Sequence, residues 1–445
     1  MQFNDMIKIA YNWIGPRGPI WNTELPHIIS FGSVSDQFEK CKSNHWWTDD
    51  MWRRYFLNRK EQFIMYPAVH LDHTDMFIYP FSITWRIPFN HYFLGSNGIL
   101  EYGHVLNSVK HLVRMFNGFF LIDDSVEAHT RPDNLRTMHD YFQGHQIPLN
   151  KIIFLTGTMN AQSLYEEFCE RNGIPNTPDC RMNVISYPSS YNVYHLTVTG
   201  VGIEPHTEPT YNPEILPSKL FLCWNRRHRQ HRLILAIALH KAGLVDRSYY
   251  SMTYDDPESP TFKIREHLDH FNNLFFGFDE NDAEAFLHTL PRKIDDITEI
   301  NEMCDDRGDR ARQFYNDSLI SLVTETNWND PEVTLTEKSF KPAKEKHPFI
   351  IVGAQHSLRA IKELGFKTFS EFWDESYDDI PNNRERLKVT IQLCKEIGTW
   401  DNNKILDFRR RVKPILEHNY NLLKIEPAAL VSSKIAEIVT RNRKT

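Results

Sequence analysis

Short apolar runs alternate along this chain with segments whose apolar residues recur at helical spacing. In the first half, the runs that predict strands are Ile7–Trp13, Gly118–Ile122, Lys151–Thr156 and Met182–Tyr187. The segments that predict helices are Leu135–Phe142 and Ala161–Asn172, and the second closes at Gly173. Since parallel strands need long crossover connections, usually helices, the alternation predicts a parallel sheet covered by helices on both faces.

Proline interrupts this pattern at residues 205–217. The prolines that fall there, together with frequent threonine and glutamate, are Pro205, Pro209, Pro213 and Pro217. Because proline breaks helices and removes a hydrogen-bond donor from a strand, this stretch predicts a linker. Residues 1–204 then form one α/β domain.

Strand and helix patterns return after the prolines. The runs that predict strands are Leu220–Trp224, Leu319–Glu325 and Phe349–Val352. The segments that predict helices are Leu233–Ala242, Ser339–Lys346 and Ser357–Leu364. We therefore expect a second α/β domain over residues 218–400. A helical segment over 401–445 is expected to pack back across the joint between the domains.

Size and composition support two folded domains. A chain of 445 residues exceeds what one hydrophobic core usually organises. With 41% hydrophobic and 24% charged residues, the composition is typical of a globular protein, so no long disordered stretch is expected. The formal net charge of -7 argues against a basic coat for non-specific nucleic-acid binding. A local basic groove is still compatible with an acidic total.

Cysteine usage and the start of the chain bear on its compartment. The six cysteines are scattered without Cys-X-X-Cys pairs, which is typical of a reducing environment. Residues 1–19 lack the charged start and apolar core of a leader, and no stretch approaches the roughly 18 apolar residues of a membrane span. We therefore expect a cytoplasmic protein that does not contact a membrane.

A basic segment follows the first strand predicted in the second domain. Leu220–Trp224 leads into Asn225 and then into arginines at the start of a helix, which are Arg226, Arg227, Arg229 and Arg232. A helix N-terminus attracts anions, and arginine can donate two hydrogen bonds at once to phosphate oxygens. Ligands of open α/β sheets bind beyond the carboxyl ends of the strands, so the segment predicts a phosphate site. A solvated, salt-bridged helix start is the alternative.

A second segment carries a carboxylate and two lysines. It reads Thr-Glu-Lys-Ser-Phe-Lys-Pro from Thr336, and Glu325 lies upstream at the end of a predicted strand. Glu337 can accept hydrogen bonds from two ribose hydroxyls, and Lys338 can neutralise a diphosphate leaving group, with Lys341 in the same run. Taken alone, the segment is equally a capped helix with ordinary surface charges.

Together, the two segments resemble the C-terminal domain of the α-1,3-fucosyltransferase-like family. That family looks like Glu-Asn-Ser, then Thr-Glu-Lys, then a strand with a Pro and a Gly. The matching positions here are Glu325-Thr326-Asn327, Thr336-Glu337-Lys338, Pro348 and Gly353. Many phage glycosyltransferases look similar too, with Thr-Glu-Lys-Ser-Phe-Lys-Pro before a His-Pro-Phe strand and a Gly-Phe-Lys-Thr-Phe segment, as at Gly365–Phe369. The likeness covers about Leu220 to Tyr377.

The resemblance implies a fold and an activity. The fold would be two Rossmann-like domains facing a cleft, the arrangement called GT-B. The activity would be transfer of a hexose or pentose from a nucleoside-diphosphate sugar to an acceptor hydroxyl, with inversion. Glu337 would bind the ribose of the donor, while Lys338 and an arginine of the first segment would bind its diphosphate. Further candidate donor-binding residues are Asn225, Glu325, Thr336 and Lys341. Neither a metal nor another cofactor is implied.

The acceptor remains open between two classes. One is a glycan or small molecule, which the acidic total charge favours. The other, suggested by the likeness to phage enzymes, is a hydroxymethylated base in phage DNA, which would have to be flipped out of the stack. DNA modification would place the protein in the cytoplasm of an infected host.

An inverting transfer also needs a general base for the acceptor hydroxyl. Candidate carboxylates follow the strand at Gly118–Ile122, namely Asp123, Asp124 and Glu127. Capping of the next helix is the alternative role for carboxylates at a strand end. Adjacent Asp-Asp is not the Asp-X-Asp motif of metal-dependent glycosyltransferases.

Four other stretches have chemically suggestive composition. His70, Asp72, His73 and Asp75 are metal-ligand types, but their spacing fits no zinc pattern, so loop roles are expected. His45–Tyr55 mixes aromatic and basic residues, which suits either core packing or stacking on a sugar or base. The short basic stretches Arg409–Lys413 and Arg441–Lys444 either face solvent or touch phosphates of a nucleic-acid acceptor.

Two further hypotheses compete with the transferase. A nucleotide- or glycan-binding protein with the same fold could have lost the chemistry. A nucleotide-dependent kinase or ligase is disfavoured because the chain has no GXXXXGK[ST] loop.

Overall fold

The computed structural model divides the chain into two compact units. Met1–Asn192 and Glu426–Thr445 form the first unit, and Val193–Ile425 forms the second. The structure describes residues 6–11, 14–15, 18–19, 62–67, 71–82, 107–125, 130–200, 206–225, 229–252, 273–294 and 309–442. Within those ranges, none of the helices combines the length and the apolar character needed to cross a bilayer.

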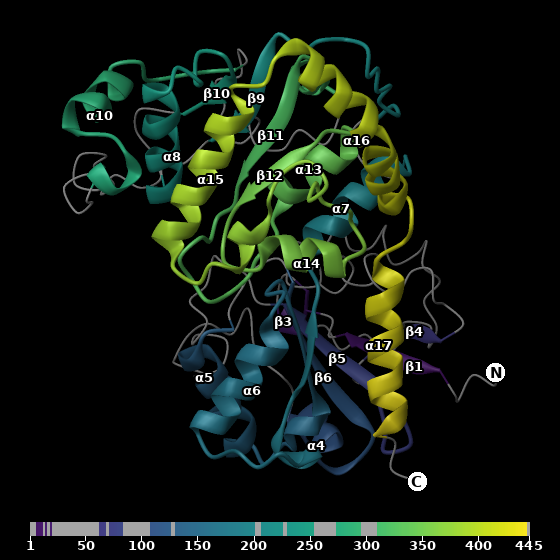
Figure 1. Ribbon diagram of the computed structural model, residues 1–445. Helices are drawn as coiled ribbons and strands as arrows, with labels where there is room; N and C mark the ends of the chain where they lie inside the picture. The colour runs from purple at the N-terminus through teal and green to yellow at the C-terminus, as the bar shows by residue number, and fades with distance from the viewer. Residues whose placement is uncertain are drawn as a thin grey trace. The chain divides into compact units, whose positions relative to one another are not determined.

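The first unit is built on a parallel sheet of six strands in the order β4-β1-β5-β6-β7-β8 (Figure 1). The strands are β1 Ile7–Tyr11, β4 Phe63–Pro67, β5 Phe77–Ser82, β6 Gly118–Asp124, β7 Ile152–Thr156 and β8 Asn183–Ser186. Each neighbouring pair runs parallel. A separate two-stranded antiparallel pair consists of β2 Ile14–Gly15 and β3 Gly18–Pro19.

Helices follow the strands of the first unit in the alternation that the sequence predicts. They are α4 Asn107–Met115, α5 Pro132–Gly144, α6 Ala161–Arg171 and the start of α7 Ser189–Val198. Short 3-10 turns lie at Leu149–Lys151 and Pro178–Cys180. Gly173, just past α6, has a φ of 64°, the left-handed conformation in which glycine commonly ends a helix.

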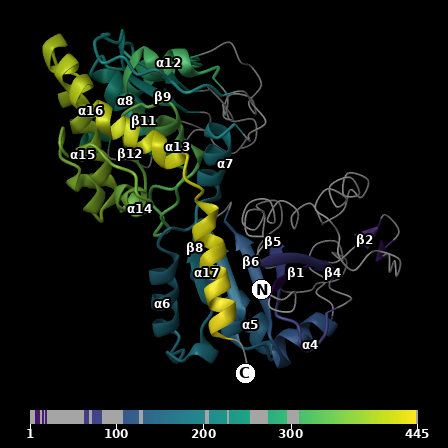
Figure 2. The same cartoon turned by 90° about the vertical axis from the view of Figure 1, so that its right-hand side faces the viewer.

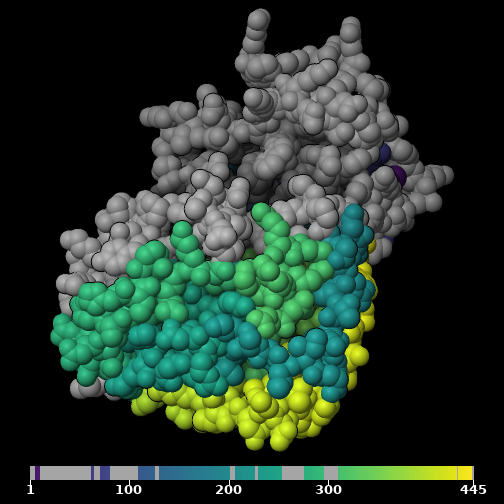
Figure 3. All heavy atoms as spheres, turned by 90° about the horizontal axis from the view of Figure 1, so that it is seen from above, coloured from purple at the N-terminus to yellow at the C-terminus, as the bar shows by residue number. Residues whose placement is uncertain are grey.

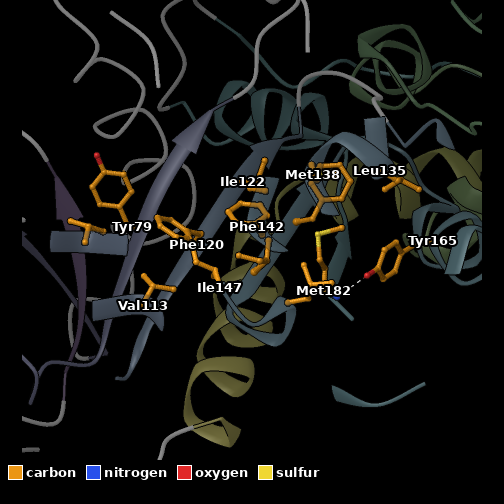
Figure 4. Packing of buried hydrophobic residues seen from close by; sticks show 14 of the residues in the cluster. Tyr79, Val113, Phe120, Ile122, Leu135, Met138, Phe142, Ile147, Tyr165 and Met182 are labelled. Atoms are coloured by element: carbon orange, nitrogen blue, oxygen red, sulfur yellow. Dashed lines mark hydrogen bonds between the residues drawn. The ribbon is translucent and has the colours of Figure 1, made fainter. Parts of the chain in front are cut away.

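Helices α4, α5 and α6 bury their apolar faces against the sheet of the first unit. The buried residues drawn and labelled in Figure 4 are Tyr79, Val113, Phe120, Ile122, Leu135, Met138, Phe142, Ile147, Tyr165 and Met182. The ring centroids of Phe120 and Phe142 lie 5.7 Å apart. The Tyr165 hydroxyl accepts a 2.8 Å hydrogen bond from the amide of Met182, so this ring also satisfies a polar group of the buried backbone.

The last helix of the chain belongs to the first unit. Figure 2 shows α17 (Ala428–Arg441) beside β8. Val431, Ile435 and Val439, spaced four residues apart, are buried among Ile185 and other apolar side chains of the sheet. Helix α16 (Asn402–Leu423) belongs to the second unit, so the C-terminal segment is shared between the two units.

Truncating Ile435 tests how much α17 contributes to the first unit. Ile435 is fully buried, so Ile435→Ala is expected to lower the free energy of unfolding by about 2–5 kcal/mol through lost burial and the cavity left behind. Urea titration followed by circular dichroism measures the loss. Lys434→Ala, at the exposed neighbouring position, should change stability by less than about 0.5 kcal/mol. Equal effects of the two variants would contradict the packing described.

The second unit contains a parallel sheet of four strands in the order β10-β9-β11-β12. These are β9 Lys219–Trp224, β10 Tyr249–Ser251, β11 Ser318–Thr324 and β12 Phe349–Val352. All three neighbouring pairs run parallel. The prediction of two α/β halves, each with a parallel sheet, is therefore confirmed.

Helices surround the sheet of the second unit. They are α8 Gln230–Lys241, α10 Glu280–Leu287, α12 Arg312–Asn316, α13 Glu337–Lys344, α14 Ser357–Glu363, α15 Asn383–Ile397 and α16. Further 3-10 turns are Asn273–Phe276 and Ser376–Asp379. Helix α8 packs against α10 and α15, while α13 packs against α16. In the space-filling view, yellow residues from the C-terminal part of the chain line one side of the visible surface (Figure 3).

The stretch predicted as a linker is part of the second unit over residues 206–217. Helix α16 holds it in place. The Arg409 guanidinium stacks 4.8 Å from the ring centroid of Tyr211, and Arg410 pairs with Glu214 at 2.6 Å. The chain changes unit at Val193, within α7, and again at Glu426. Since proline breaks helices and these contacts tie the segment to α16, residues 206–217 follow the surface of that helix.

Candidate donor site

The carboxyl ends of β9 and β11 lie side by side in the second unit. Asn225 directly follows β9, and Glu325 directly follows β11. The hydroxyl of Thr324 donates a 2.6 Å hydrogen bond to the side-chain oxygen of Asn225. Asn225 is 3% exposed, so this bond fixes its amide at the edge where open α/β sheets bind ligands.

The first turn of α8 reaches across to the end of β11. His231 Nε2 lies 2.9 Å from the carbonyl oxygen of Glu325, which places the proton on that nitrogen. Arg232 donates a 3.0 Å hydrogen bond to the carbonyl oxygen of Thr324. Both side chains are buried. The two charged segments recognised in the sequence are therefore neighbours in space.

The buried guanidinium of Arg232 remains a cation at neutral pH. Burial and the nearby charge of Arg229 lower its pKa to about 10, against the opposite influence of Glu325 and Glu337. Arg229 occupies the N-cap position of α8 and is more exposed than Arg232. Arg229 is thus the better placed of the two to meet an anion from solvent.

Helix α13 begins beside this edge with a capped first turn. The hydroxyl of Thr336, the N-cap residue, accepts a hydrogen bond from the amide of Lys338. Lys338 Nζ lies 2.6 Å from a carboxylate oxygen of Glu337. The side chains of Glu337 and Lys338 are 34% and 22% exposed, so both groups are accessible from solvent.

The charges around Glu337 keep it ionised. Burial alone would raise its pKa, but the ammonium groups of Lys338 and Lys341 outweigh that effect and lower the pKa to about 2. Lys341, one turn further along α13, is 8% exposed. Glu337 therefore presents a carboxylate that can accept hydrogen bonds from vicinal hydroxyls, next to a lysine that can attract a phosphate.

Glu325 differs from Glu337 in its surroundings. It is fully buried, and hydroxyls of Thr336 and Ser339 donate to its carboxylate at 2.6 Å each. It faces the first turn of α13. Ser339 was not among the site residues expected from sequence, although it follows Lys338 directly in the Thr-Glu-Lys-Ser run.

A buried arginine supports the loops at the same end of the sheet. Arg386 of α15 is 4% exposed and donates to the carbonyl oxygens of Gly353, Ile380 and Trp328. Trp328 in turn stacks on His231, with ring centroids 5.4 Å apart. The sequence contained no sign of this role, because the contacts join residues far apart along the chain.

The candidate bases of the first unit lie at the end of β6. Asp123 and Asp124 are 2% and 0% exposed. A carboxylate oxygen of Asp124 accepts a 2.9 Å hydrogen bond from the Thr156 hydroxyl, which joins β6 to β7. Asp123 accepts a 3.0 Å bond from the amide of Ser125. Their catalytic role stays a prediction, and Glu127 lies outside the described residues, as do Arg226 and Arg227 of the donor segment.

Among the described residues, one group of metal-ligand types lies close together. Ligand atoms of His206, Asp309 and Glu345 fall within 4.8 Å of one another. Arg312 already donates to Asp309 at 2.7 Å and to Glu345 at 2.9 Å. Lys344 lies 2.7 Å from the other oxygen of Glu345. These lone pairs are engaged by cations, so the group is best described as an ion-pair network.

Other stretches noted in the sequence are found in ordinary contacts. Asp72 accepts a hydrogen bond from the amide of Thr74, and Asp75 pairs with Lys8. His70 and the aromatic stretch at residues 45–55 lie outside the described residues. On α16, the exposed Arg411 lies 3.5 Å from Asp407, whereas Arg409 of the same basic stretch is buried against Tyr211.

Comparisons with known proteins give little beyond this geometry. No family model matches the chain, and no curated protein matches it. The structure is similar to that of an alpha,alpha-trehalose 6-phosphate synthase from Burkholderia multivorans, with a TM-score of 0.39 and 12% identity over 83% of this chain and 73% of that one. It is also similar to a UDP-forming alpha,alpha-trehalose-phosphate synthase from Burkholderia vietnamiensis, with a TM-score of 0.40 and 12% identity over 92% and 85%. Likenesses at this level carry no conclusion about function.

Proposed function

We propose that this protein is a glycosyltransferase that takes its sugar from a nucleoside-diphosphate donor bound in the second unit. The observation that supports the proposal most directly is the meeting of two charged segments at the carboxyl ends of β9 and β11. Arg232 bonds to the carbonyl oxygen of Thr324, and His231 bonds to that of Glu325. The carboxylate of Glu325 in turn accepts from the Thr336 hydroxyl at the start of α13. One departing diphosphate can therefore be approached by cations from both segments.

In this proposal each exposed group of the α13 turn has a separate task. Glu337 accepts hydrogen bonds from the ribose hydroxyls, since its carboxylate stays ionised at any physiological pH. Lys338, with Arg229, stabilises the negative charge that develops on the diphosphate. As the acceptor oxygen bonds to the anomeric carbon, the bond from that carbon to the diphosphate breaks. A carboxylate takes the acceptor proton.

The family we propose is the α-1,3-fucosyltransferase-like family and its phage relatives. The support is the Thr-Glu-Lys run, which the structure places at the capped start of α13. Asp123, Asp124 and Glu127 remain the proposed bases. Each carboxylate is replaced by its amide, and both sugar transfer and hydrolysis of the donor in the absence of acceptor are measured. The comparison separates a proton acceptor from a residue that only holds β6 and β7 together.

The donor is tested by thermal shift against GDP, UDP, ADP and CMP sugars. A ligand that binds only the folded state raises the melting temperature with its concentration, so one nucleotide should stabilise the protein selectively. Transfer is then measured as release of the free nucleotide when an acceptor is added. Binding without turnover on any acceptor would favour the alternative, a nucleotide- or glycan-binding protein of the same fold.

The acceptor class is separated by a salt titration. A protein that holds a hydroxymethylated DNA duplex through its phosphates loses affinity steeply as salt rises. Retention of the protein on the hydroxymethylated duplex with that salt dependence, together with no binding of unmodified single nucleosides, supports DNA as the acceptor. Turnover on free glycans that is insensitive to salt supports the other class.

A further inference from the structure

Glu325 occupies the position where four elements of the donor site meet. Its amide donates to the carbonyl oxygen of Val352 at the end of β12, at 3.0 Å. Its own carbonyl oxygen accepts from His231 at the start of α8. Its side chain is directed at the first turn of α13, and the residue itself directly follows β11. Glu325 thus contacts the starts of α8 and α13, the two helices whose first turns carry proposed donor-binding groups.

The carboxylate of Glu325 is occupied by donors from the protein. One oxygen accepts from the Thr336 amide at 3.0 Å and the Ser339 hydroxyl at 2.6 Å. The other accepts from the Thr336 hydroxyl at 2.6 Å and the Thr326 amide at 3.2 Å. A carboxylate has about four acceptor positions, so these four hydrogen bonds leave none for a sugar hydroxyl. The residue is also fully buried.

From this geometry we infer that Glu325 is a positioning residue, which holds the N-terminus of α13 against the end of β11 so that Glu337 and Lys338 face the donor. The inference rests on the proposed function for the identity of the ligand. It revises the direct donor contact expected from sequence for Glu325. Charge-assisted hydrogen bonds of this kind are short and strong, which suits a group that must fix a helix start without moving.

The division of labour between the two glutamates follows from their exposure. Glu337 is about one-third exposed and pairs with Lys338, whereas Glu325 has none of its surface open to solvent. Only Glu337 can therefore exchange a water for a ribose hydroxyl. A glutamine at 325 would keep the shape but turn one acceptor into a donor, which would face the Thr336 amide or a hydroxyl.

The first arm of the test uses the free protein. In Glu325→Gln, the amides of 336–339 are expected to exchange with solvent at least tenfold faster than in the wild type, while those of helix α6 in the first unit are unchanged. Ser339→Ala removes one of the four hydrogen bonds and is expected to give a smaller effect in the same direction. It serves as the second variant if Glu325→Gln folds poorly. Unchanged exchange at Thr336 in both variants would overturn the inference.

The second arm compares ligands with and without the ribose hydroxyls. GDP, UDP and ADP and their 2′,3′-dideoxy counterparts are titrated against the wild type, Glu325→Gln and Glu337→Gln. A positioning role predicts that Glu325→Gln weakens binding of the nucleotide about tenfold or more and still weakens binding of the dideoxy form, because the variant displaces Lys338 as well as Glu337. Glu337→Gln should weaken only the form that carries the hydroxyls. If the effect of Glu325→Gln disappears with the dideoxy form, Glu325 contacts the ribose and the inference is wrong.

The two arms distinguish the inference from the proposed function. If the wild type binds none of these nucleotides, the proposed function is wrong, and the exchange rates at Thr336 alone support or overturn the positioning role. If a nucleotide binds normally to Glu325→Gln, the function stands and the inference fails. Thr336→Ser, which keeps the hydroxyl that Glu325 accepts from, should restore binding that Thr336→Val loses.

Discussion

Lys338→Ala is expected to reduce the rate of nucleoside-diphosphate release by about 100- to 1000-fold, the cost of removing one preorganised electrostatic partner of a developing charge. Its ammonium group lies at the start of α13, 2.6 Å from Glu337, and its side chain is 22% exposed. The fold should therefore survive. Release of nucleotide from the selected donor, with saturating acceptor, measures kcat, while a titration of the donor gives KM.

Lys404→Ala is the matched control for this prediction. Lys404 is an exposed lysine of the same unit, on α16, whose ammonium lies 4.7 Å from the ring centroid of Trp400. Its removal should leave turnover within about twofold of the wild type, since screened surface charges contribute little. Equal losses in both variants, or no loss in Lys338→Ala, would show that Lys338 does not meet the leaving group.

The second large effect is a loss of folding stability at acidic pH. His347 is buried between the starts of β11 and β12, where its Nδ1 lies 2.8 Å from the Ser321 hydroxyl and its Nε2 lies 3.0 Å from the Ser318 carbonyl oxygen. Burial lowers its pKa from 6.5 to about 4. The unfolded chain thus binds a proton at a pH where the folded chain does not. Between pH 6.5 and 4 this difference costs about 3 kcal/mol of stability, and no further loss follows below pH 4.

Urea unfolding between pH 7.5 and 4 checks this acid effect. As the pH is lowered, the free energy of unfolding should fall less steeply in His347→Gln, which cannot titrate at this position, than in the wild type. The two slopes should differ by up to about 1.4 kcal/mol per pH unit. His288→Gln, at an exposed position of the same unit, should keep the wild-type slope. Parallel slopes for the wild type and His347→Gln would mean that His347 titrates in the folded protein as it does in the unfolded chain.

The elements from Gly118 onward were largely predictable because each strand is a short apolar run with a helix after it. Phe349–Val352 is found with the predicted bounds, and Gly118–Ile122 is extended by two residues. Strand β5 was missed, since it contains Pro80, and a proline argues against a strand inside a sheet. In the structure Pro80 nonetheless pairs with Leu121 in the middle of the sheet. Helix α15, with its capping Asn382, was also missed.

The residues that make up the site were predictable from the sequence, but the separate roles of those residues were not. The basic turn after β9 and the Thr-Glu-Lys run were visible as charged residues following apolar strands, and adjacent parallel strands bring such residues together. The sequence could not distinguish Glu325 from Glu337, because both are glutamates next to a strand or helix end. Only burial and hydrogen-bond partners separate a residue that fixes the backbone from one that can meet a ligand.

The membership of α17 in the first unit has a consequence for synthesis on the ribosome. The apolar surface formed by the sheet of the first unit is translated early, but the helix that covers part of it emerges only after all of Val193–Ile425 has been made. Until then, the nascent chain exposes an apolar surface around Ile185. Premature termination anywhere in the second unit should therefore yield fragments that bind chaperones or aggregate, even when the missing residues of the second unit do not contact that surface.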